Sequence, residues 1–340
     1  MQHTPTKVSR RGGAETEGAG LGQRGEAETE GRGWDSETRL GQRSEVETEG
    51  LGWDRRTGLG QRDEVGAEGG ILITVDLERC TGCGTCEKDC FSRNIFVRNG
   101  KAQVASPLCI HCGHCVAVCP SNAVEIPEYD MADVATLGTT DLSPEELLTF
   151  IKARRSIRQY KDKPVDPELV KQIIEAGRYT PTASNRQELT FIVIEKELLA
   201  FRSLVAENLA ELGRAMLASE GTSELLSNYA RRWLEIEKVY REDPKQKDAL
   251  FLGAPLVILV AGDHPVDAGL AASNMELVAC ANRLGVLYSG FITRGATGEK
   301  IKTAVGIPPG KEVLVSLLVG YPAVKYQRTA PRKKADVVWN

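Results

Sequence analysis

The 340-residue sequence predicts an α+β fold, with two folded domains behind a repeat-containing tail. Eight of the nine cysteines fall between residues 80 and 119, in two short runs. Amphipathic helical patterns and apolar strand patterns fill the sequence from residue 140 onward, whereas residues 1–70 hold 16 of the 34 glycines. We therefore expect a disordered low-complexity tail over 1–70, a small cysteine-rich domain over 71–130 and a larger domain over 140–335.

The tail contains a tandem repeat. "LGQRGEAETEG" at residue 21 returns as "LGQRSEVETEG" at 40 and "LGQRDEVGAEG" at 59, a period of 19 residues. Each unit offers a leucine, sometimes a valine, and a tryptophan between copies, among glycine and charged residues. This apolar surface is too small to offset the entropy of an ordered chain, so we predict disorder.

Charge and hydropathy narrow the class of protein. Residues 1–70 carry 10 Lys and Arg against 14 Asp and Glu, a net charge of −4 that equals the net charge of the whole chain, so residues 71–340 are neutral. A neutral body gives no electrostatic reason to expect nucleic acid or an acidic membrane as partner. No apolar run reaches the roughly 18 residues of a membrane span, and no apolar core follows the basic start. We expect a cytoplasmic protein that binds neither.

The cysteine runs share the spacing C-x2-C-x2-C-x3-C. Disulfides would need an oxidising compartment, and structural zinc usually takes two C-x2-C pairs separated by a longer loop. A third thiolate two residues further on suits a cubane [4Fe–4S] cluster, so we interpret the runs as ligands of two such clusters. His111 and His114 are expected to be loop residues, because cysteines already fill every ligand position. The candidate metal ligands are Cys80, Cys83, Cys86, Cys90, Cys109, Cys112, Cys115 and Cys119.

This spacing resembles the two-cluster bacterial ferredoxin over about residues 71–130. The resemblance implies that the fourth cysteine of each run binds the other cluster, so Cys119 completes the first set and Cys90 the second. Phe91, where the family has proline, removes no ligand. Two clusters carry single electrons but do no bond chemistry on an organic substrate unaided, so we expect the acceptor in the larger domain.

The larger domain opens with two capped helices. Ser143, with Pro144 and Glu146, predicts the start of a helix that ends at "RRSIR", and Asp166 with Pro167 predicts the start of the next. Further helices are expected over 196–218, 223–241 and 266–284, the last with Gly285 as the residue after its cap. "APLVILVAG" and "EVLVSLLVGYP" predict buried strands, and Tyr229, Trp233, Tyr240 and Cys280 are expected to pack in the core.

Two polar groups of this domain are candidate cofactor contacts. The arginines of "RRSIR" suit phosphate oxygens and can stabilise negative charge on a reduced ring. The amides and hydroxyls of the loop Pro181–Gln187 suit the edge of a heterocycle. Taken singly, each pattern also fits a solvated basic run or a polar turn.

Taken in order, R-R-S-x-R-x-[YF], P-[ST]-x-x-N-x-Q, "GVLYSGF" and "VGYP…R" resemble the FMN-dependent nitroreductase family over about residues 140–335. The resemblance implies an α/β/α sandwich with a mixed sheet, and a homodimer with FMN at its interface. Ser289 departs from the acidic residue that many members carry near the flavin N5 atom. The implied cofactor contacts are Arg154, Arg155, Ser156, Arg158, Ser289, Gly290 and Arg328 and, from the partner subunit, Pro181, Thr182, Ser184, Asn185 and Gln187.

The expected function is that of an iron–sulfur flavoprotein oxidoreductase. Electrons would pass from the two clusters to FMN, which would reduce an electron-poor nitroaromatic, quinone or activated alkene by hydride transfer from N5, with no catalytic side chain. The expected electron donor is ferredoxin or NAD(P)H, and the sequence does not distinguish between them. Two alternatives stay open: a redox carrier or sensor without substrate turnover, and a narrower reductive dehalogenation or cofactor-biosynthesis reaction at the same site.

Overall fold

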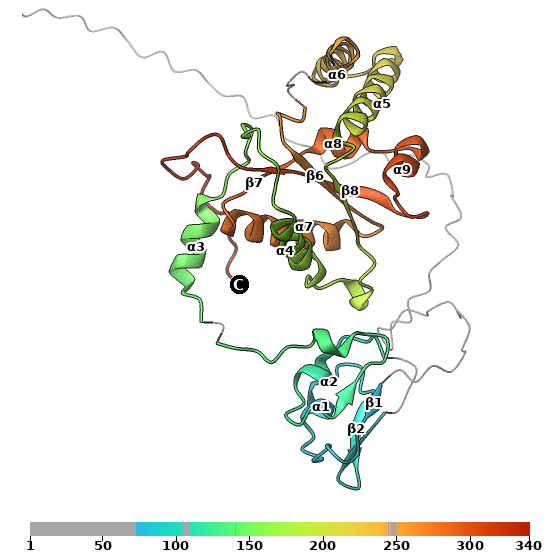
Figure 1. The fold of residues 1–340 in the computed structure, drawn as a ribbon, viewed down its shortest axis with the longest axis vertical. Coiled ribbons are helices and arrows are strands. Elements are labelled where there is room, and N and C mark those ends of the chain that lie inside the picture. The colour runs from blue at the N-terminus through green and yellow to red at the C-terminus, as the bar shows by residue number, and fades with distance from the viewer. Residues whose placement is uncertain (1–72, 105–108, 140, 244, 246–249) are drawn as a thin grey trace, which may run out of the picture. The chain divides into compact units, whose positions relative to one another are not determined.

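Two small sheets and one four-stranded sheet organise the part of the chain that the computed structural model describes, which is residues 73–104, 109–139, 141–243, 245 and 250–340 (Figure 1). The predicted disorder of residues 1–70 falls outside these ranges. The described residues belong to one compact unit, Glu68–Asn340.

The cysteine-rich domain is built from two antiparallel strand pairs. Strand β1 (Thr74–Val75) pairs with β4 (Val124–Glu125), and β2 (Ile95–Arg98) pairs with β3 (Lys101–Val104). Two short helices, α1 (Thr85–Asp89) and α2 (His114–Ala117), carry the third cysteine of each run. Cys80, Cys86 and Cys115 are buried with a few aliphatic side chains, so the thiols form part of this small core. A 3₁₀ turn, η1 (Met131–Asp133), follows.

The larger domain contains a sheet with strand order β5-β6-β8-β7. Its strands are β5 (Thr190–Ile194), β6 (Leu256–Gly262), β7 (Gly285–Tyr288) and β8 (Glu312–Gly320), and all neighbouring pairs are antiparallel. The parallel component of the mixed sheet is the bridge between Ser156 and Val286. Both strands predicted from apolar runs, β6 and β8, are confirmed at the centre of the sheet.

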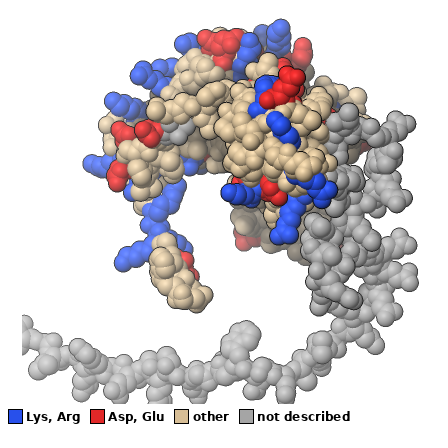
Figure 2. Space-filling view, turned by 90° about the horizontal axis from the view of Figure 1, so that it is seen from below, with Lys and Arg blue, Asp and Glu red and all other residues tan. Residues whose placement is uncertain are grey.

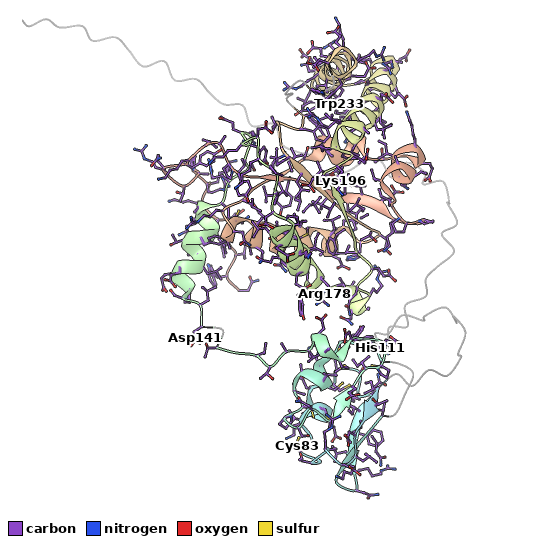
Figure 3. The ribbon with its side chains drawn as sticks, viewed as in Figure 1. Cys83, His111, Asp141, Arg178, Lys196 and Trp233 are labelled. Atoms are coloured by element: carbon purple, nitrogen blue, oxygen red, sulfur yellow. The ribbon has the colours of Figure 1, made fainter. Side chains whose placement is uncertain are left out.

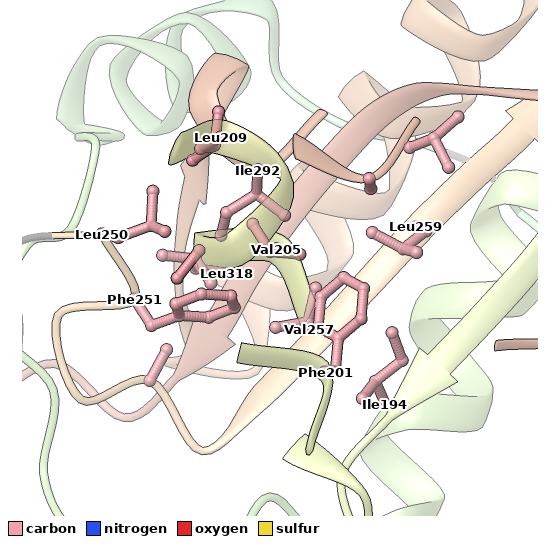
Figure 4. Packing of buried hydrophobic residues seen from close by; sticks show 14 of the residues in the cluster. Ile194, Phe201, Val205, Leu209, Leu250, Phe251, Val257, Leu259, Ile292 and Leu318 are labelled. Atoms are coloured by element: carbon pink, nitrogen blue, oxygen red, sulfur yellow. The ribbon is translucent and has the colours of Figure 1, made fainter. Parts of the chain in front are cut away.

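Side chains of β6 point alternately to the two faces of the sheet, and helices cover both faces. Leu256, Ile258 and Val260 pack in the cluster on the side of α4 (Pro167–Arg178) and α7 (Pro265–Ala281). The intervening Val257 and Leu259 face Phe201 and Val205 of α5 (Leu198–Ala218) (Figure 4). Because successive strand residues point to opposite faces, one apolar strand joins two cores in an α/β/α sandwich.

Three further helices complete the second layer. Helix α6 (Glu224–Glu242) packs along α5, and α8 (Gly290–Gly295) and α9 (Glu299–Val305) also contact α5. Trp233 and Tyr240 are buried in the core as predicted, whereas Tyr229 is 38% exposed and packs edge-on against Phe291.

The first two helices of the larger domain begin at the residues predicted to cap them. Helix α3 (Pro144–Ala153) begins after Ser143, whose side chain accepts from the N–H of Glu146, and Asp166 caps α4 by accepting from Glu168. The prediction that Gly285 follows the cap of α7 is wrong. The helix ends at Ala281, and Arg283 takes the left-handed conformation (φ 61°) while the Leu284 N–H bonds the Ala279 carbonyl, as in a Schellman motif.

Cationic and anionic side chains lie interspersed on the face of the molecule drawn in Figure 2. Within the described ranges, no helix combines the length and the apolar character needed to cross a membrane.

Candidate functional site

The structure groups the cysteines of the two runs into two sets. Cys80, Cys83, Cys86 and Cys119 line one cavity. Cys90 lies close enough to Cys109 and Cys115 to influence their ionisation, and Cys112 acts on the same two thiols. Each set therefore combines three cysteines of one run with the fourth of the other, the sharing that the ferredoxin resemblance implies. Cys83 and His111, one from each run, are labelled in Figure 3.

The thiols differ in how readily they ionise. Burial raises the pKa of Cys115 to about 11, and it also raises the pKa values of Cys86 and Cys109. Burial opposes ionisation of Cys90 and Cys119 too, but backbone N–H donors and a serine hydroxyl near each sulfur outweigh it and lower their pKa. Binding of iron would draw the protons from the raised thiols, because metal ligation needs thiolates.

The fourth cysteine of each run has the same hydrogen-bond surroundings. The N–H of Asn94 donates to Cys90 Sγ over 3.3 Å, and the N–H of Ala123 donates to Cys119 Sγ over 3.2 Å. Donors to sulfur stabilise thiolates and set the potential of iron–sulfur clusters, so this donor set fits cubane ligation. Among the residues with assigned positions, no three His, Cys, Asp or Glu side chains converge as ligands of a single metal ion.

Backbone packing around the first cysteine set requires a glycine. Gly82 has φ +70°, and a Cβ there would lie 2.1 Å from the carbonyl oxygen of Gly100. Only glycine permits both the left-handed conformation and this close approach of two chain segments.

A second candidate site is an open cavity of about 890 Å³ in the larger domain. We call it the arginine pocket, because side chains of the "RRSIR" segment form much of its wall. It is lined by Ile151, Lys152, Arg154, Arg155, Ser156, Arg158, Glu276, Tyr288, Tyr326, Thr329, Ala330 and Arg332. The structure thus brings four of the predicted FMN contacts to one cavity: Arg154, Arg155, Ser156 and Arg158.

Backbone pairing holds the arginines at this wall. The N–H of Ile157 donates to the Val286 carbonyl over 3.0 Å, and the Tyr160 hydroxyl donates to the Leu318 carbonyl over 3.1 Å. Ile157 is buried while its neighbours Ser156 and Arg158 are exposed, as expected where successive residues of an extended segment point to opposite faces.

Arg154 is the best-defined cation of the pocket. Its Nη1 atom pairs with the buried carboxylate of Glu276, while its Nε atom is buried and has no hydrogen-bond partner in the described structure. Burial raises the pKa of Glu276, although the charge of Arg154 and a hydrogen bond from Tyr288 oppose that shift. An anionic group bound here would satisfy the unpaired Nε donor.

Some predicted contacts do not line the pocket in the same chain. Ser289 caps α8, with its Oγ accepting from the Ile292 N–H and its own N–H donating to Ser316. The pocket lining also lacks Gly290 and Arg328 but includes Arg332, which the sequence analysis did not select. The loop Pro181–Gln187 is likewise absent from this lining, and its predicted route to the flavin is from the partner subunit.

The loop Pro181–Gln187 has an unusual backbone. Ser184, Asn185 and Gln187 all have positive φ angles, between 51° and 55°, around the 3₁₀ turn η2 (Ala183–Asn185). Buried Asp267 accepts from the Ala183 N–H over 3.1 Å, and Thr182 Oγ1 accepts from the Gln187 N–H over 3.0 Å. Residues other than glycine hold a positive φ angle only where the surrounding structure fixes them. Loops with such residues are concentrated at functional sites.

Sequence reasoning missed Glu276 and Tyr288, which touch the arginine pocket. A signal for Glu276 exists, because it is a carboxylate within the apolar, small-residue sequence of α7, and buried carboxylates need a partner. Tyr288 stands directly before the selected Ser289.

Models of two protein families match the two predicted domains of the chain. The model of the nitroreductase family matches residues 151–321, half of the chain, and the model of the 4Fe-4S dicluster domain matches residues 72–121. An NADPH-dependent oxidoreductase of Staphylococcus aureus (strain USA300) is 25% identical over 206 residues, which cover 58% of this chain and 73% of that protein.

Two solved nitroreductase structures are similar to more than half of the chain. A nitroreductase with bound FMN from Desulfitobacterium hafniense DCB-2 is 26% identical, with a TM-score of 0.43, over 57% of this chain and 98% of that one. A nitroreductase with bound FMN from Bacteroides fragilis NCTC 9343 is 20% identical, with a TM-score of 0.44, over 57% of this chain and 99% of that one. Because the family model matches half of the chain, the chain belongs to the nitroreductase family, and a 4Fe-4S dicluster domain precedes its nitroreductase domain.

Proposed function

We propose that the protein is an FMN-dependent iron–sulfur oxidoreductase that reduces an electron-poor small molecule. The eight cysteines of the two runs would hold two [4Fe–4S] clusters, and the arginine pocket would hold FMN. When bound, the clusters supply single electrons and the flavin supplies hydride chemistry toward a nitroaromatic, quinone or activated alkene.

The observation that carries this proposal is the buried, unpartnered Nε of Arg154 in a cavity lined by further cations. A phosphate or an anionic ring would accept from this donor, and guanidinium groups stabilise such charge more strongly in a partly buried site than in water. Arg155 lies over the Tyr326 ring, with 5.1 Å from its Cζ atom to the ring centroid, which fixes a second guanidinium at the cavity wall.

A homodimer belongs to the proposal. Helix α3 carries Leu147, Leu148 and Ile151 on one side, yet it has no buried residue in the described chain. A second copy of the chain would cover this apolar face and would bring its loop Pro181–Gln187 to the arginine pocket. A cytoplasmic location stays a prediction.

The test is anaerobic purification of the full chain, followed by quantification of iron and flavin and by turnover assays. We expect about eight irons and about one FMN per chain, and consumption of a nitroaromatic or quinone when reduced ferredoxin or NADPH supplies electrons. Absence of bound flavin after reconstitution would overturn the proposal. Flavin that is bleached and reoxidised without consumption of any acceptor would instead support a redox carrier or sensor, and selective dehalogenation would support the narrower reaction.

A further inference from the structure

The predicted flavin loop is hydrogen-bonded to the second cysteine run. Asn185 Nδ2 donates to the His111 carbonyl over 2.9 Å and approaches the Ile110 carbonyl at 3.2 Å. These two carbonyls lie between Cys109 and Cys112, so one amide of the larger domain holds the backbone between two predicted cluster ligands.

Tyr129 completes the contact. Its hydroxyl donates to the same His111 carbonyl over 3.0 Å and accepts from Gln187 Nε2 over 2.8 Å and from Asn185 Nδ2 over 3.3 Å. A hydroxyl has one donor and two acceptor sites, so this arrangement uses its whole capacity. Nearby, Arg178 of α4 pairs with Asp133 at 2.8 Å, although a pair this exposed contributes little free energy.

Both sides of the contact have a fixed and uncommon backbone conformation. His111 has φ 51°, and Asn185 and Gln187 have φ 55° and 52°. Asp267 and Thr182 hold the loop from its own domain, as described above, and Glu128 Oε2 lies 2.7 Å from His111 Nδ1 on the other side. The two segments are therefore preorganised to meet, which lowers the entropy cost of the contact.

The contact distinguishes the two cysteine runs. Within the described ranges, residues 80–90 make no hydrogen bond or ion pair to residues 141–340, whereas the second run makes the bonds given above. We propose that Asn185 and Tyr129 are positioning residues that fasten the second cysteine run (Cys109–Cys119) to the loop Pro181–Gln187, so that the second cluster is the one coupled to the flavin site. This inference depends on the proposed function only for the presence of flavin; the docking itself does not need it.

The experiment uses the full chain with reconstituted clusters, in three variants. Asn185→Ala removes the amide, Tyr129→Phe removes only the hydroxyl of a residue that is not itself a predicted flavin contact, and Asn208→Ala is the matched control. Asn208 Nδ2 likewise donates to two backbone carbonyls, of Gly295 over 2.9 Å and Thr297 over 2.8 Å. Hydrogen–deuterium exchange of peptides and potentiometric titration of the two clusters are measured in parallel with flavin content.

We expect Asn185→Ala and Tyr129→Phe to speed exchange over residues 109–131 by about fivefold or more, the effect of losing one net hydrogen bond, without change over 80–98. Loss of the amide that draws electron density from the ligand loop should lower the potential of one cluster and leave the other unchanged. Asn208→Ala should alter exchange only near residues 295–297.

Unchanged exchange over 109–131 in both variants, or equal shifts of both cluster potentials, would overturn the inference even if flavin is bound. Local exchange that responds as expected in a protein without flavin would leave the docking intact and refute the proposed function instead. The two failures are therefore distinguishable.

Discussion

Arg154 and Glu276, 122 positions apart in the sequence, form an ion pair at the wall of the arginine pocket. The pair joins the segment after α3 to the middle of α7. It uses one terminal nitrogen of the guanidinium and leaves the buried Nε free for a bound anion. Cys280 and Tyr288 also face this pair, and burial raises the pKa of both side chains, that of Cys280 to about 11.

Replacement of Arg154 should weaken flavin binding. Arg154→Lys keeps the positive charge but loses the planar fork, so we expect FMN affinity to fall roughly 10- to 100-fold, as for loss of a charge-assisted hydrogen bond. Fluorescence titration of the protein with FMN measures this. Arg231→Lys, at an exposed arginine whose partner is Asn228, serves as control and should bind FMN like the parent. Equal affinity of Arg154→Lys and the control would contradict the assignment.

Glu276 should give the protein a defined pH dependence of stability. Its pKa is raised in the folded state above the ordinary value of 4.5, because burial disfavours the charged form. The stability contributed by the protonated form is therefore fully present below pH 4.5 and is lost as the pH rises through the folded pKa. Denaturant unfolding across this range should show the loss in the parent and not in Glu276→Gln. Parallel curves for the two proteins would show that Glu276 does not titrate as inferred.

Loss of a shared cysteine should empty the other run's site. Cys119→Ser removes a ligand from the set of Cys80, Cys83 and Cys86, so iron should fall from about eight to about four per chain, while the set of Cys109 is retained. Iron analysis and electron paramagnetic resonance of the reduced protein measure this. Cys280→Ser should keep the full iron content, because Cys280 lies with Glu276 and Arg154 in the larger domain.

Gly285 should tolerate no side chain. A Cβ at this position would lie 2.3 Å from Ile157 Cγ1, so Gly285→Ala should displace the segment that carries the pocket arginines. We expect a loss of about 1–3 kcal/mol in the free energy of unfolding, with weaker FMN binding. The control is Gly269→Ala within α7, where a Cβ meets nothing within 4 Å and should stabilise the helix by about 0.5–1 kcal/mol. Equal stability of both variants would show that Ile157 and the strand beside it can shift to make room for the added methyl group.

The apolar side of α3 should hold the homodimer together. Leu148 is 50% exposed, and Leu148→Glu would place a charge in the proposed interface. We expect light scattering to report a monomer that has lost its FMN, because the partner's loop no longer reaches the pocket. Thr149→Glu, on the opposite side of the same helix, should remain dimeric. A dimer that survives Leu148→Glu would place the interface elsewhere.

Local patterns made much of the fold predictable. The caps at Ser143 and Asp166 depend on residues within one helical turn. The apolar run Leu256–Gly262 has the length of a buried strand, so the sequence predicts both features. The end of α7 was misjudged because Arg283, and not a glycine, adopts the left-handed conformation there. Gly285 is needed instead for its close approach to Ile157, which lies more than a hundred residues earlier in the chain.

Residue types and their spacing already specify the donor chemistry: eight thiols at cluster spacing, with a ferredoxin-like sharing of Cys90 and Cys119, and a group of arginines suited to an anion. The contacts of Glu276 with Arg154 and of Asn185 with the backbone of His111 become visible only in the folded chain. Residue type and spacing fix local conformation and donor chemistry, whereas contacts between residues tens to hundreds of positions apart depend on the packing of the whole chain.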